Sequence, residues 1–162
     1  SYYYPVDFSD KFRTYFKIRG SLGFLSKWGN NAIPIHTRYR LGGASNLRGF
    51  KHLDIGPKKS RTTTTQGQSV NYNYGGDKQF YGQFEYYVPI IQQAGIKALV
   101  FADIGQVFEE KDKISLSNLK ADVGFGFRLL TPMGPFRFEF AYPYDTRKRS
   151  LGEMQFVFNV GY

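Results

Sequence analysis

The stretch FRTYFKIRGSLGFL, residues Phe12 to Leu25, alternates between two faces. Every second side chain is apolar or small, namely Phe12, Thr14, Phe16, Ile18, Gly20, Leu22 and Phe24. The side chains between them are mostly basic or polar. Period-two alternation over this length predicts one long β-strand. It exceeds the usual globular strand of about 5 to 6 residues and suits a tilted membrane strand of about 9 to 11.

Five further stretches alternate in the same way. They cover residues 79–89, 97–108, 120–130, 136–142 and 153–162. Tyr2 to Tyr4 predicts the end of another strand, which Pro5 is expected to stop. The chain therefore contains seven strand-like segments, the first of them partial.

The connections differ in length between the two ends of these strands. Those at 90–96 and 131–134 are short, whereas those at 41–78, 109–119 and 143–152 are long and polar. Alternation alone fits both a soluble sandwich, with its apolar faces buried, and a barrel, with its apolar faces toward lipid. Strand length, aromatic content and this asymmetry of turns favour the barrel. The predicted fold is all-β: a transmembrane antiparallel β-barrel, of which this chain supplies about six to seven strands.

The composition supports that class without defining a function. Among 162 residues, Lys and Arg number 22 and Asp and Glu 13, which gives a net charge of +9 and favours an anionic partner. The chain contains 16 Phe and 13 Tyr but no Cys, so it has no disulfide and no thiolate metal site. Aromatic residues near strand ends are expected to form girdles at the membrane interfaces, namely Tyr86, Tyr87, Phe108, Tyr142 and Tyr144.

The longest connection, Leu41 to Lys78, begins with the sequence RLGGASNLRGF (residues 40–50) and follows no hydrophobic period. Long loops without secondary structure are uncommon unless they are functional or disordered. Gly42, Gly43 and Gly49 are candidates for positive φ or close backbone approach, although ordinary loop glycines fit equally well at the first two. Arg48 is the one cation among residues 41–50. The later, basic half, including residues 58–61, could meet phosphate groups, but a solvated charge run is the simpler interpretation.

Five motifs occur in one order: LGGASNLRGF, QFYGQFEYYVPI, ALVFADIGQVF, ADVGFGFRLLTPMGPFRFEFAYP and MQFVFNVGY. Together they resemble the C-terminal half of the barrel of BamA-type outer-membrane assembly factors, a superfamily that includes TamA-like factors and two-partner secretion transporters. The resemblance implies that residues 1–162 form the C-terminal part of one sixteen-stranded barrel domain, with residues 41–78 as an extracellular loop. POTRA domains are absent from this chain.

The resemblance also assigns roles to particular residues. Leu47, Arg48, Gly49 and Phe50 match the loop signature of that family. The family pattern places this Arg against a strand that carries an aromatic and an aspartate, here Phe101 and Asp103. We therefore expect an ion pair between Arg48 and Asp103, with Arg48 stacked on Phe101.

The last strand carries the second implied site. The resemblance implies that it forms a weak lateral seam where client strands enter, and its candidate residues are Phe156, Phe158, Asn159 and Gly161. Gly161, expected inside this strand, would weaken it locally.

The residues indicate no enzyme. Neither His36 nor His52 has a partner at suggestive spacing, and no phosphate loop or nucleophile–base pair stands out. The resemblance instead implies an insertase of the bacterial outer membrane without metal or cofactor. Its partners would be outer-membrane lipid and lipopolysaccharide, unfolded outer-membrane protein clients and periplasmic accessory lipoproteins, but not nucleic acid. A two-partner-secretion transporter and a passive porin-like channel remain alternatives.

Overall fold

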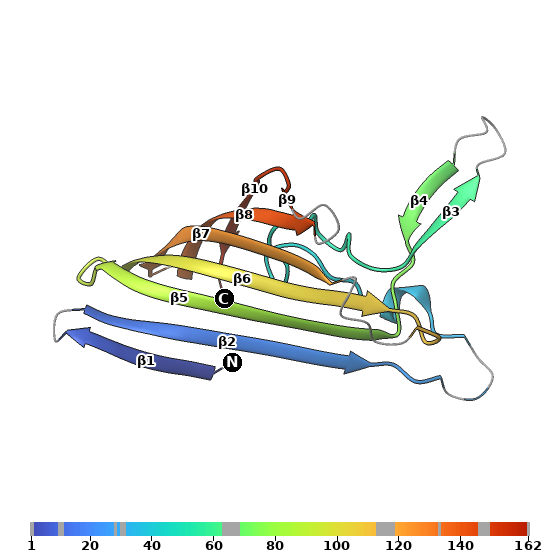
Figure 1. Cartoon of the computed structure of the whole chain (residues 1–162), viewed down its shortest axis with the longest axis horizontal. Coiled ribbons are helices and arrows are strands. Elements are labelled where there is room, and N and C mark those ends of the chain that lie inside the picture. The colour runs from blue at the N-terminus through green and yellow to red at the C-terminus, as the bar shows by residue number, and fades with distance from the viewer. Residues whose placement is uncertain are drawn as a thin grey trace.

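The computed structural model describes residues 2–9, 12–27, 29, 32–62, 69–112, 119–132, 134–145 and 150–161. Its main element is one curved antiparallel sheet (Figure 1). The sheet consists of β1 (Tyr2–Ser9), β2 (Phe12–Phe24), β5 (Lys78–Ile91), β6 (Ile96–Phe108), β7 (Lys120–Thr131), β8 (Gly134–Asp145), β9 (Ser150–Leu151) and β10 (Gln155–Val160). The strand order is β1-β2-β5-β6-β7-β8-β10, with the short β9 also paired to β8.

The sheet is polar inside and apolar outside, as the barrel prediction requires. Glu85, Asp103 and Glu139 on the concave face are buried, whereas Val100 and Phe156 on the convex face are more than half exposed. A soluble sandwich would show the opposite burial, with apolar side chains enclosed. The all-β antiparallel prediction is confirmed. Among the described residues, no helix has the length and apolar character needed to cross a membrane.

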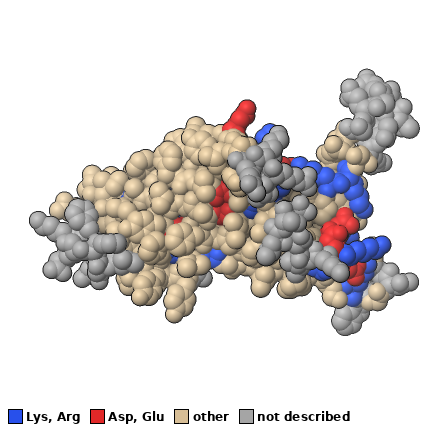
Figure 2. Space-filling model, in the orientation of Figure 1, with Lys and Arg blue, Asp and Glu red and all other residues tan. Residues whose placement is uncertain are grey.

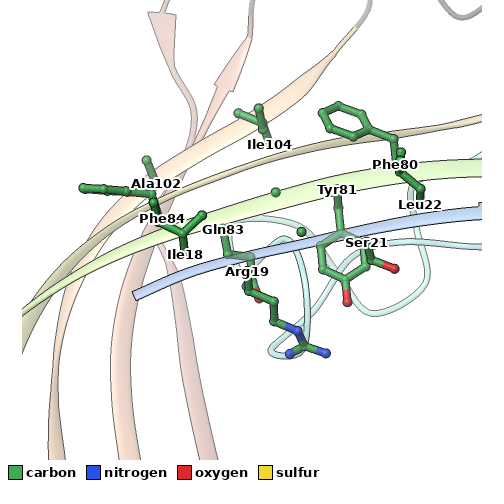
Figure 3. Close-up of a pocket in the computed structure, with 12 residues that line it drawn as sticks. Ile18, Arg19, Ser21, Leu22, Phe80, Tyr81, Gln83, Phe84, Ala102 and Ile104 are labelled. Carbon is green, nitrogen blue, oxygen red and sulfur yellow. The ribbon is translucent and has the colours of Figure 1, made fainter. Parts of the chain in front are cut away.

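The alternation is visible where β2, β5 and β6 lie side by side. On the convex face Gly20 and Gly82 are directly opposite each other and leave a shallow apolar hollow. Figure 3 shows Ile104 and Phe80 on that side of the ribbons, whereas Arg19 points to the other side. Successive residues of one strand therefore meet two different environments.

Two sequence-based expectations for the start of the chain and the long loop were wrong. Pro5 does not end β1, which continues to Ser9 with Pro5 paired opposite Tyr15. Residues 35–37 form a short 3-10 helix. The later part of the loop, which showed no recognisable pattern, contains a hairpin of β3 (Lys58–Thr62) and β4 (Ser69–Asn73).

The long and short connections lie at opposite ends of the sheet, as expected. The β3–β4 hairpin projects from the long-loop end (Figure 1), where Lys and Arg side chains gather on the visible face (Figure 2). The turns between β5 and β6 and between β7 and β8 form the other end. In outer-membrane barrels the short turns are periplasmic.

Candidate functional site

The tip of the long loop folds on itself before it meets the sheet. Asn46 Oδ1 accepts hydrogen bonds from the backbone N–H of Gly42 at 2.6 Å and of Leu47 at 2.8 Å. Gly42 has a φ of +116°, and a methyl group on it would overlap the carbonyl oxygen of Lys51. Glycine is therefore required at this position. The glycine and the hydrogen bonds of Asn46 together fix the conformation of the loop tip from within the loop itself.

Apolar packing attaches this unit to the concave face. Leu47 is fully buried and belongs to a cluster of Leu41, Leu47, Ile55, Tyr81 and Val107. Two further hydrogen bonds run from strand side chains to the loop backbone: Gln83 Nε2 donates to the carbonyl of Asn46 at 2.9 Å, and Arg137 Nη2 to that of Ala44 at 3.0 Å. The loop is thus seated on β5, β6 and β8.

Arg48 is 1% exposed, and its guanidinium faces three carboxylates. Nε and Nη2 each donate to an oxygen of Asp103 at 2.7 Å, so this pair is bidentate. Nη1 donates to Glu85 Oε1 at 2.7 Å and lies 3.4 Å from Glu139 Oε1. The guanidinium carbon lies 3.6 Å from the centroid of the Phe101 ring. Arg48 therefore combines a fork-shaped ion pair with a cation–π contact, which lysine could not reproduce.

Sheet register explains how acids from three strands reach one cation. Inward residues form cross-strand rows, and the relevant rows are Arg19–Gln83–Asp103–Asp122, Lys17–Glu85–Phe101–Gly124–Ala141 and Tyr15–Tyr87–Leu99–Gly126–Glu139. Adjacent rows on one face are two residues apart along each strand. Glu85, Asp103 and Glu139 thus surround Phe101 from neighbouring positions, and Arg48 covers the ring.

Further cations complete what we call the inner charge network: Arg48, Asp103, Glu85, Glu139, Arg128 and Lys17. Arg128 Nη2 donates to Oε1 of Glu85 at 2.8 Å and of Glu139 at 2.9 Å. On the other oxygen of Glu85, Lys17 Nζ lies at 3.2 Å and the Tyr87 hydroxyl donates at 2.9 Å. Both oxygens of Glu85 are therefore occupied, as a buried carboxylate requires.

Burial alone would lower the pKa of the Arg48 guanidinium. The hydrogen bond and charge of Asp103, together with the charges of Glu139 and Glu85, outweigh that effect and raise the pKa above its usual value. Arg48 thus remains charged throughout the accessible pH range.

The predicted ion pair of Arg48 with Asp103 and its stacking on Phe101 are present. The sequence interpretation missed Glu85 and Glu139 as partners of Arg48. Only the register, which sequence patterns leave open, shows that they converge. Gly49 makes a close approach, since a Cβ there would lie 2.6 Å from Asp122 Cβ.

Tyr87 and Phe108 were wrongly expected in an interfacial girdle. Tyr87 is 1% exposed because it shares the inward face with Glu85, and it stacks on Tyr15 at 4.6 Å between centroids. Phe108 is also buried, at the end of β6.

Asp122 provides a test of the electrostatics. It is fully buried directly opposite Asp103. Like charges in directly opposed positions destabilise a sheet. Asp122→Asn is therefore expected to raise the free energy of unfolding by about 1 kcal/mol, because an amide can donate to Asp103. The measurement is the temperature at which the full-length barrel loses compact migration in a gel. Asp103→Asn is the matched control and should lower that temperature; a lower temperature for Asp122→Asn would contradict the prediction.

The last strand is the shortest member of the sheet path. β10 pairs with β8 over six residues, whereas β5 and β6 pair over thirteen. Phe156, Phe158 and Val160 point outward and are about half exposed. Gly161 lies just after β10 rather than within it, with a φ of +102° and its N–H bonded to the Pro135 carbonyl at 3.0 Å. The expected glycine inside the strand was therefore wrong by one residue, because its positive φ ends the extended backbone.

Among the described residues, no three His, Cys, Asp or Glu side chains are arranged to hold a metal ion. The assembled groups are instead a buried ion network and an apolar loop anchor. Such an arrangement can fix a loop inside a wall.

Residues 1–162 match the model of the Omp85 superfamily domain. The chain is 27% identical over 135 residues to the outer membrane protein assembly factor BamA of Nitratidesulfovibrio vulgaris, covering 82% of this chain and 16% of that protein. It is 25% identical over 171 residues to BamA of Neisseria meningitidis serogroup B, covering 88% and 21%.

A solved structure agrees in fold. The crystal structure of BamA from Haemophilus ducreyi lacking POTRA domains 1–3 matches with a TM-score of 0.72 and 23% identity, over 95% of this chain and 32% of that chain. The chain spans less than a quarter of the length of the two curated relatives.

Proposed function

Because the chain belongs to the Omp85 superfamily, we propose that it is the seam-bearing part of an outer-membrane protein insertase. The chain is an outer-membrane β-barrel segment. In the proposed mechanism the loop braces the inner wall through Arg48, while β10 offers its free edge to a strand of the client. Each new strand then gains backbone hydrogen bonds by β-augmentation.

The short β10 is the observation that carries this proposal. In the described sheet β10 pairs only with β8, and its other edge carries no partner strand. Because β10 has only six residues, a strand that pairs along that edge exchanges few ladder hydrogen bonds. Unpaired backbone N–H and C=O groups are costly in a bilayer, so a client strand lowers its free energy by pairing with the edge of β10. The acids and bases of the inner charge network are engaged with one another, and we assign them a structural rather than an enzymatic role.

The proposed partners follow from this mechanism. Clients are unfolded outer-membrane proteins, and periplasmic accessory lipoproteins are further partners. The basic long-loop end faces lipopolysaccharide, whose phosphates complement Lys58 and Lys59. No cofactor is needed, because client folding supplies the free energy.

A cysteine cross-linking experiment tests the seam. The full-length parent protein would carry Phe158→Cys on β10, and a stalled client would carry cysteines along its last strand. We expect disulfides between position 158 and those client cysteines that face it when the client strand pairs with β10. Antiparallel pairing brings the Cβ atoms of facing residues to about 4.5–5.5 Å. Phe84→Cys on β5 is the matched control, since its side chain is 43% exposed against 51% for Phe158. Equal cross-linking at both positions would refute a seam at β10.

A further inference from the structure

The concave face holds a cavity of about 350 Å³. It lies between the short turns and the long loop that Arg48 attaches to the sheet. Its charged lining consists of Lys17, Arg19, Lys97, Arg128 and Arg137, and its aromatic lining of Tyr3, Tyr15 and Tyr87. Gly95 and Pro135, beside the short turns, line the same cavity. The cavity therefore reaches the end of the sheet that faces the periplasm in outer-membrane barrels.

Three of these cations stand in one row across the sheet. Lys97 on β6 is directly opposite Arg128 on β7, which is directly opposite Arg137 on β8. Like charges in opposed positions destabilise a sheet unless an anion offsets them. Asn159 on β10 continues the row beyond Arg137.

The carboxylates of the wall offset only part of this charge. Glu85 and Glu139 contact Arg128, but both also contact Arg48 from the loop. The five cavity cations and Arg48 make six positive groups. The buried carboxylates near them number four, namely Glu85, Glu139, Asp103 and Asp122.

Two of the cations are free to serve another anion. In the part of the chain that the structure describes, neither Lys97 nor Arg19 lies within ion-pair distance of a carboxylate. Lys97 Nζ donates to the Tyr15 hydroxyl at 3.3 Å and lies 5.2 Å from the centroid of that ring, and Arg19 lies 5.8 Å from the Tyr81 centroid. An excess of one sign in a recessed site raises the local concentration of the opposite ion.

We propose that this cavity binds an acidic, extended segment of polypeptide presented from the short-turn end. The cations do not converge on one point as a phosphate site would require, since Lys97 extends toward Tyr15 and Arg137 toward the Ala44 carbonyl. They are spread over adjacent strands about 4.8 Å apart, so an elongated anion spans more of them than a single compact one does. Tyr and Arg side chains together are also typical of surfaces that bind protein.

The test uses the full-length parent protein in nanodiscs and a fluorescent peptide of alternating Asp and Ser. Fluorescence anisotropy should show binding that weakens with salt, and a matched Asn–Ser peptide should bind far more weakly. The double variant Lys97→Gln, Arg19→Gln should lose about tenfold in affinity, because it removes the two uncommitted cations while leaving the contacts of Arg48 in place. The double variant Lys51→Gln, Lys111→Gln removes the same charge from exposed positions at the long-loop end and should bind as wild type.

Two results would overturn the inference. One is equal affinity of wild type and the Lys97, Arg19 variant, which would show that the cavity does not hold the peptide. The other is displacement of the peptide by inorganic phosphate or pyrophosphate at the same molar concentration of anionic groups, which would identify a phosphate site. Peptide binding depends on where the strands place the cavity cations and not on insertase activity. The cross-linking test of the seam and the peptide-binding test can therefore fail independently.

Discussion

Arg48→Ala is expected to destabilise the seated loop by about 3–5 kcal/mol and to abolish client insertion by the full-length protein. The substitution leaves Asp103 without its bidentate partner and removes one of the three cations on Glu85. An uncompensated carboxylate in a buried site costs more than the original pair contributes. The loop should leave the wall, and the barrel should assemble poorly.

Heat-modifiable gel migration measures assembly, and insertion of a reporter barrel into proteoliposomes measures function. Arg48→Lys should give an intermediate loss, because an ammonium keeps the charge but cannot form the fork or stack on Phe101. Lys51→Ala is the control for loss of an exposed cation from the same loop. Adding Asp103→Asn to Arg48→Ala should recover part of the stability and none of the insertion. Insertion at the wild-type rate by Arg48→Ala would refute a functional role for the pinned loop.

Gly124→Val is expected to displace Phe101 and lower the free energy of unfolding by about 3 kcal/mol or more. A Cβ on Gly124 would overlap both the Phe101 ring and the backbone carbonyl oxygen of Phe140. The ring can move only by leaving Arg48, whose guanidinium lies 3.6 Å from its centroid. The substitution should therefore release the loop without changing any charge.

The measurement is protease sensitivity of the loop in the full-length barrel, followed by chemical denaturation. Gly82→Val is the matched control: Gly82 also lies in a central strand, but on the convex face, where its Cβ would meet Ile104 at an ordinary 3.6 Å. That variant should keep the loop protected. Similar loop cleavage in both variants would mean that the ring does not hold the loop.

Much of the fold follows from the sequence because membrane strands repeat with a period of two. Six of the seven predicted strand segments end within about three residues of the observed strands, and the inward face was identified by its charges. Pro5 was misjudged because proline loses only its own N–H and can adopt extended backbone, so that β1 continues past it, with Pro5 opposite Tyr15. The β3–β4 hairpin was missed because Lys58 to Thr62 shows no apolar alternation and its pairing is local.

The site was predictable in part. Arg48, Phe101 and Asp103 were found through resemblance, whereas composition alone favours a solvated arginine in such a loop. Glu85 and Glu139 required knowledge of register across β5, β6, β7 and β8, which no single strand encodes. The functional roles of Phe156, Phe158, Asn159 and Gly161 at the seam stay predictions.

The contacts of Arg48 also depend on the register of the strands. Asp103 and Glu85 are separated from Arg48 by 55 and 37 residues along the chain. A one-residue slip of β6 would turn Asp103 toward lipid, and a two-residue slip would put Phe101 or Gly105 in its place. Arg48 would then have no fork partner, and its burial would be unfavourable. Stable seating of the loop therefore requires the strands to be aligned correctly, so that the buried guanidinium favours the native register of the sheet over a slipped one.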